Sequence, residues 1–77
     1  MVKRLISMNG ITDVTKMVTL AMMCDGDIVI SSGRYAVDAK SILGVFSLDL
    51  TRGVNIEYPE ELVGTEFDEF IKTFEIS

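Results

Sequence analysis

The sequence contains no histidine and no tryptophan, and it has only one cysteine and one proline. Without histidine, the chain cannot assemble a Ser-His-Asp or Cys-His catalytic constellation. The single Cys24 excludes an internal disulfide and offers no metal-binding cysteine spacing. We therefore expect neither an enzyme nor a cofactor. A chain without disulfides fits a reducing compartment, and we expect a cytoplasmic location.

Long hydrophobic runs and an excess of positive charge are also missing. No apolar run approaches the roughly 20 residues that span a bilayer, and residues 1–6 become polar too soon for a signal peptide. Seven basic residues against twelve acidic ones give a net charge of −5. Because nucleic-acid binding requires a basic surface, we expect no nucleic-acid partner and no membrane association.

The 77 residues are long enough for one small domain, and 48% of them are hydrophobic, which suits a folded core. Hydrophobic periodicity predicts strands at residues 2–8, 28–30, 35–37 and 54–58. It predicts helices at residues 13–24, at 42 to about 48, and from about Thr65 onward. This β-α-β-β-α-β-α order predicts an α+β fold, an open-faced β-sandwich in which helices cover one face of a four-stranded antiparallel sheet.

The first predicted helix carries a clear apolar stripe. Its apolar residues recur at a spacing of three and four positions: Val14, Met17, Val18, Ala21 and Cys24. Thr12 or Asp13 is the expected N-cap. Of the neighbouring Met22 and Met23, we expect one to enter the core. Cys24 is interpreted as a small buried hydrophobe rather than a nucleophile.

Acidic residues gather toward the end of the chain, where two adjacent carboxylate pairs occur, at residues 60–61 and 68–69. Both pairs are interpreted as solvated surface, because acid–base catalysis needs two carboxylates in contrasting environments.

A serine followed by an apolar run marks the short second helix. Ser41 is the expected N-cap, with a cap hydrogen bond that contributes about 1 kcal/mol. So short a helix cannot bury all of Ile42, Leu43 and Phe46, and for Leu43 and Phe46 both surface docking and core packing remain open. Val45 and Leu48 are assigned to the core. Gly44 is interpreted as permitting close packing against a neighbouring element.

The segment that carries this serine, Tyr35-Ala-Val-Asp-Ala-Lys-Ser-Ile-Leu-Gly-Val-Phe-Ser-Leu48, resembles the regulatory-serine segment of HPr, the phosphocarrier of the bacterial sugar phosphotransferase system. The predicted order of elements is also that of HPr. The resemblance implies that a dedicated kinase phosphorylates Ser41. It also implies that Ile42, Leu43 and Phe46 form a docking surface for partner proteins. Lys40 then either pairs with the phosphate or is a solvated cation.

The phosphoryl-accepting site of the same family is altered in this chain. The family carries Gly-Ile-His-Ala-Arg-Pro-Ala near its start, and the matching residues here begin at Gly10-Ile11-Thr12. Thr12 occupies the position of the histidine, while Val14 and Thr15 occupy those of the arginine and the proline. A threonine phosphate would be a stable ester, and imidazole chemistry is lost.

The resemblance therefore implies a non-catalytic HPr-like regulatory or binding module, similar to the relatives that act in catabolite repression and sugar-transport regulation. HPr kinase and a transcriptional regulator are the implied partners, both bound through the Ser41 helix. Two alternatives remain: a structural or self-assembling protein of the same fold without phosphorylation, and a phosphocarrier with an unrecognised acceptor. The sequence leaves the oligomeric state open.

Overall fold

Four strands and three α-helices build the domain, which a computed structural model describes over residues 1–76. The strands are β1 (Val2–Ile6), β2 (Val29–Ser32), β3 (Tyr35–Asp38) and β4 (Val54–Tyr58). The α-helices are α1 (Ile11–Met22), α2 (Ile42–Phe46) and α3 (Glu66–Lys72), and two 3-10 helices, η1 (Leu50–Arg52) and η2 (Glu60–Leu62), flank β4. The predicted α+β class is confirmed.

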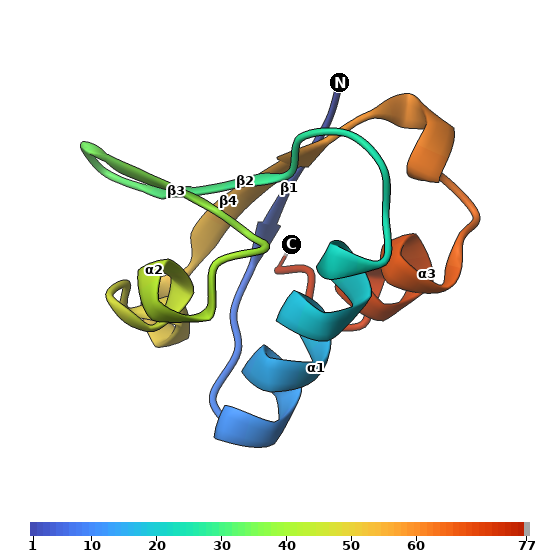
Figure 1. Cartoon of the computed structure of the whole chain (residues 1–77). Helices are drawn as coiled ribbons and strands as arrows, with labels where there is room; N and C mark the ends of the chain where they lie inside the picture. Colours follow the sequence, from blue (N-terminus) through green and yellow to red (C-terminus); the bar gives the residue numbers. More distant parts are fainter. Residues whose placement is uncertain (77) are drawn as a thin grey trace.

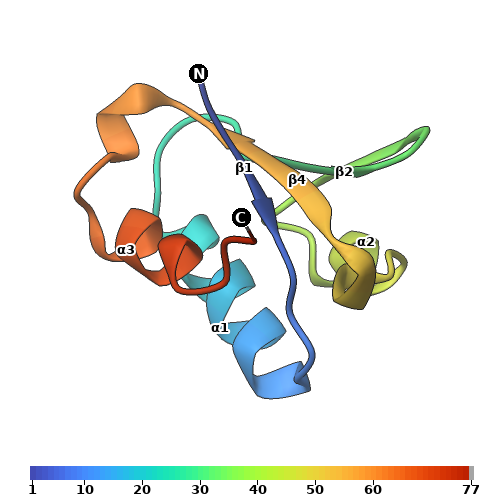
Figure 2. The same cartoon turned by 180° about the vertical axis from the view of Figure 1, so that it is seen from behind.

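The sheet is open and antiparallel, with the strand order β1-β4-β2-β3. Figures 1 and 2 show the three helices on one side of this sheet and no element on the other. The β2–β3 hairpin extends away from the helices at one edge. At the other edge the C-terminal segment follows β1, where the backbone N–H of Ile76 donates to the carbonyl of Leu5 at 2.9 Å. β3 is therefore the edge strand without such a cover.

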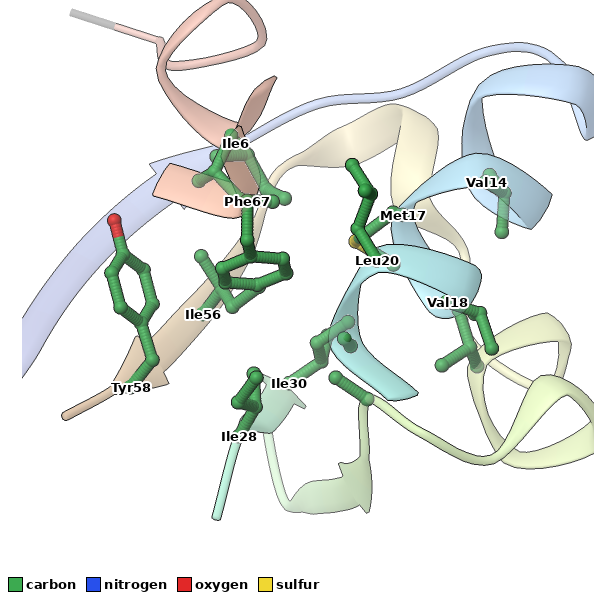
Figure 3. Close-up of a cluster of buried hydrophobic side chains, with 14 of the residues drawn as sticks. Ile6, Val14, Met17, Val18, Leu20, Ile28, Ile30, Ile56, Tyr58 and Phe67 are labelled. Atoms are coloured by element: carbon green, nitrogen blue, oxygen red, sulfur yellow. The ribbon is translucent and has the colours of Figure 1, made fainter. Parts of the chain in front are cut away.

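The core fills the space between the sheet and the helices. β4 alternates as its sequence predicts, with Val54, Ile56 and Tyr58 buried and the intervening residues partly exposed. Helix α1 contributes one buried stripe to this core: Val14, Met17, Val18, Leu20 and Ala21. Figure 3 shows Phe67 of α3 between this stripe and the β4 residues Ile56 and Tyr58. The ring of Phe67 meets that of Tyr58 edge to face, with centroids 5.3 Å apart.

Several element boundaries differ from the sequence prediction. β1 ends at Ile6, although Met8 beyond it is still buried. Helix α1 begins at Ile11 instead of residue 13, and its N-cap is Gly10, which makes no side-chain cap. Thr12 and Asp13 are thus inside the first turn, where the Asp13 carboxylate complements the helix dipole. α1 and α2 also end two residues earlier than predicted, at Met22 and Phe46.

The β2–β3 connection is tighter than predicted, because Ser31 and Ser32 belong to β2 and pair with β3. Only Gly33 and Arg34 form the turn, and Gly33 adopts the positive φ of +58° that a two-residue hairpin turn requires.

The methionine prediction for the end of α1 is wrong. Met22 is 64% exposed and Met23 is 77% exposed, so neither enters the core. The buried stripe runs through Met17, Val18 and Ala21, and the next two positions turn toward solvent as the helix ends.

Within residues 1–76, no helix is long and apolar enough to cross a bilayer.

Candidate functional site

Ser41 caps α2 as its sequence position predicts. Its backbone is extended, and its Oγ accepts a hydrogen bond from the backbone N–H of Gly44 at 3.2 Å. The residue itself is exposed, so its hydroxyl is both a structural cap and reachable from solvent.

Three large side chains of α2 lie at the surface and form what we call the α2 face: Ile42, Leu43 and Phe46. Leu43 is 83% exposed, Phe46 43% and Ile42 39%. Val45 of the same helix is fully buried, and Leu48, just beyond the end of the helix, packs partly against the core. The question left open by the sequence is therefore answered in favour of surface exposure for Leu43 and Phe46.

Gly44 allows α2 to approach the sheet closely. A Cβ at this position would lie 3.4 Å from Cβ of Val37 and 3.2 Å from Oγ of Ser41. The predicted packing role of Gly44 is confirmed, and the residue also keeps the cap hydrogen bond of Ser41 free of a side chain.

Lys40 is not the freely solvated cation that was one of the two expectations for it, because its ammonium group is hydrogen-bonded within the domain. Its Nζ donates to the backbone carbonyl of Cys24 at 2.8 Å, just beyond the end of α1. A cation in this position complements the negative end of the helix dipole. Lys40 thus ties the start of the Ser41 segment to the end of α1.

Thr12, the position that the resemblance assigns to the phosphoryl acceptor, is exposed in the first turn of α1. Its two altered neighbours differ in environment, since Val14 is buried and Thr15 is exposed. A buried valine provides no positive charge to hold a phosphoryl group, and it packs into the core instead.

Cys24 is partly buried and its Sγ donates to the carbonyl of Leu20 at 3.3 Å. Burial raises the pKa of the thiol, which the nearby Lys40 only partly offsets. A thiol in this state is a poor nucleophile at neutral pH.

The sequence interpretation missed a buried polar cluster formed by Arg4, Tyr58 and Asp68. It had placed Asp68 on the exposed surface. Asp68 is fully buried. Its Oδ1 accepts a hydrogen bond from the hydroxyl of Tyr58, and its Oδ2 accepts one from the backbone N–H of Gly64 at 2.9 Å. The Nε of Arg4 donates to the same tyrosine oxygen at 2.8 Å.

Two cations face this carboxylate. Nη2 of Arg4 lies 3.7 Å from Oδ1 of Asp68, and Nζ of Lys72 lies 3.6 Å from Oδ2. Burial alone would raise the pKa of Asp68, but the hydrogen bonds from Gly64 and Tyr58 and the two cations hold it below its ordinary value. Burial, together with the Asp68 carboxylate, raises the pKa of Tyr58 to about 12.

Every polar group of the Arg4–Tyr58–Asp68 cluster has a partner, and no buried side-chain nitrogen or oxygen within residues 1–76 lacks one. A satisfied network of this kind fixes the position of α3 against the sheet. We therefore assign this cluster a structural role.

Replacing Ser41 with alanine should lower the free energy of unfolding by about 1 kcal/mol, because the N–H of Gly44 loses its acceptor. Ser41→Asp keeps an acceptor at the cap and should remain within about 0.5 kcal/mol of the wild type. Urea unfolding of the two variants measures the difference. An equal and large loss in both would show that the exposed serine has some other structural role.

No group of three or more His, Cys, Asp or Glu residues within residues 1–76 is placed to hold a metal ion.

In comparisons with known proteins, no family model matches the chain, and no curated protein or solved structure is significantly similar to it.

Proposed function

We propose that the chain is a non-catalytic, HPr-like regulatory module that binds a protein partner through the α2 face and is controlled by phosphorylation of Ser41. The observation that carries this proposal is the exposure of Leu43 and Phe46 directly beside an exposed serine. Because these large side chains are exposed on a helix of only five residues, they contribute little to the core. Grouped exposed apolar residues are typical of interaction sites.

The resemblance to HPr indicates which classes of protein would bind this surface. In HPr-like proteins the matching serine is phosphorylated by a kinase, and the matching apolar residues contact partner proteins. A phosphate on Ser41 would keep an oxygen acceptor at the cap while adding nearly two negative charges beside the α2 face. The kinase and a transcriptional regulator of catabolite repression are therefore the proposed partners.

Phosphoryl transfer through the first helix is not part of this proposal. Thr12 has no imidazole, and Val14 is committed to the core. A phosphocarrier with another acceptor would show acid-labile phosphate after incubation with phosphoenolpyruvate and the first enzyme of the system.

The competing function is self-assembly without phosphorylation. β3 is an edge strand, and its Tyr35 is 72% exposed, so the strand could pair with a second copy. This alternative predicts a dimer or larger species that forms without ATP.

Incubation with HPr kinase and ATP, followed by intact-mass measurement, tests the proposal. We expect one added phosphate on the wild type and none on Ser41→Ala. Absence of phosphate on the wild type would remove the regulatory part of the proposal. Sedimentation of the same samples reports whether the chain self-associates.

The docking part is tested by Phe46→Ser. We expect this variant to bind the phosphoserine-dependent regulator at least about tenfold more weakly, while its free energy of unfolding changes by less than about 1 kcal/mol. Val45→Ala is the matched control, since Val45 is buried in the same helix and its truncation should destabilise the fold by more than Phe46→Ser does. The reverse order of stabilities would contradict a surface role for Phe46.

A further inference from the structure

An open groove of about 600 Å³ lies where the end of α1 faces the connection between β4 and α3. Figures 1 and 2 place η2, which borders this groove, on the opposite side of the molecule from α2. The groove is therefore separate from the α2 face. Its volume is within the range of sites that bind ligands or anchoring side chains.

The floor of the groove is apolar. Leu20 of α1, Leu62 of η2 and Phe67 of α3 all line it, and each is at least nine-tenths buried in the free domain. Met23 also lines the groove and is 77% exposed. Methionine side chains are flexible and polarisable, so Met23 can adapt to an occupant.

Two further exposed apolar residues are neighbours in the sequence of residues that line the groove. Met22 precedes Met23 and is 64% exposed, and Val63 follows Leu62 and is 53% exposed. An apolar groove of this kind is a surface that an amphipathic helix or peptide recognises.

The charged residues that line the groove are all acidic. Asp25, Glu61 and Glu66 line it, all three are exposed, and no lysine or arginine does so within the described chain. The ion pairs found in residues 1–76 involve other acids, such as Glu60 with the N-terminal amine. The three carboxylates are thus available to an external cation.

We propose that this groove binds an amphipathic segment of a partner protein, with a large apolar side chain on the floor and a neighbouring lysine or arginine against the acidic rim. Binding would remove the apolar surface of the floor from water, which favours the complex. The rim carboxylates are exposed, so the ion pairs that they form with the segment mainly orient it and speed its association. Added salt weakens these ion pairs.

The proposal is tested with a synthetic amphipathic peptide of leucine and lysine and a matched peptide of leucine and glutamate. Calorimetry against the whole chain should show binding of the lysine peptide that weakens as salt is added, and no binding of the glutamate peptide. The ¹³C-methyl resonance of Met23 should shift on titration, whereas that of the buried Met8 should not.

Glu61→Lys reverses one charge at the rim and should weaken binding of the lysine peptide by about fivefold at low salt. Glu57→Lys is the matched control: it changes the net charge equally but lies on β4 at a position outside the groove. We expect the control to stay within about twofold of the wild type, since Glu57 does not line the groove and can affect the peptide only through the screened charge of the whole domain. Circular dichroism confirms that both variants are folded.

Equal weakening by both charge reversals would show a non-specific charge effect and overturn the proposal. So would loss of peptide binding in Phe46→Ser, because that would place the peptide on the α2 face. Failure of the lysine peptide to bind, or an unmoved Met23 resonance, would also refute a site in this groove.

Discussion

Replacing Asp68 with alanine is expected to lower the free energy of unfolding by about 3 kcal/mol. The substitution removes the acceptor for the hydroxyl of Tyr58 and for the backbone N–H of Gly64, and both donors are in a buried or partly buried setting. It also removes one of the two carboxylates that face Arg4, whose side chain is only 20% exposed, and leaves the arginine with Glu75 alone. Unpaired groups of this kind carry their full desolvation cost.

The adjacent residue provides the control. Glu69 is exposed and pairs only with Lys72 on the surface, so Glu69→Ala should change stability by less than about 0.5 kcal/mol. Urea unfolding of the two variants measures the contrast. Equal effects would mean that the Arg4–Tyr58–Asp68 cluster contributes no more than a surface pair.

The same cluster predicts the response to acid. The pKa of Asp68 is lower in the folded chain than its ordinary value of about 3.9. Its contribution to stability is therefore complete above the unfolded pKa and is lost as pH falls through the folded pKa. The stability difference between the wild type and Asp68→Asn should shrink below about pH 4. A difference that stays constant down to pH 2 would contradict the lowered pKa.

Truncation of Phe67 to alanine is the second change expected to have a large effect, about 3–5 kcal/mol. The ring is 2% exposed and lies between α1 and β4, in edge-to-face contact with Tyr58. A domain of this size has a total stability of the same order, so much of the variant should be unfolded at room temperature.

Phe70→Ala is the matched control in the same helix, because Phe70 is only partly buried at the edge of the core. Calorimetric or circular dichroism melts should show a clearly smaller loss for Phe70→Ala. Equal losses of stability in the two variants would contradict the central position of Phe67 in the core.

The local patterns in the sequence were sufficient for the order of the elements. The alternation of Val54, Ile56 and Tyr58 predicted β4, and Ser41 and Thr65 marked the starts of α2 and α3 because their hydroxyls cap the first turns. The shortness of α2 indicated that Ile42, Leu43 and Phe46 could not all be buried, and the structure exposes all three. These features depend on residues that are close together in the chain.

The buried cluster could not be predicted in the same way. Asp68 stands beside Glu69 in an acidic stretch, and nothing local separates the two carboxylates. Its burial depends on Tyr58 from β4 and Arg4 from β1, which only the folded sheet brings together. Arg4 on β1 provides both a donor for the hydroxyl of Tyr58 and a positive charge beside Asp68. The exposure of Met22 and Met23 likewise depended on where α1 ends.

The pairing of β1 with β4 also constrains the order in which the chain can fold. Arg4 and Tyr58 are hydrogen-bonded but lie 54 residues apart, and Val2 faces Tyr58 across the sheet. During synthesis β1 emerges before β4, its neighbour in the sheet, which begins only at Val54. The final place of β1 is available only when β4 has appeared, and pairings between such distant segments form slowly because a long loop must close first. Folding on the ribosome should therefore be delayed until β4 has emerged, and fragments that stop before Val54 should lack a stable sheet.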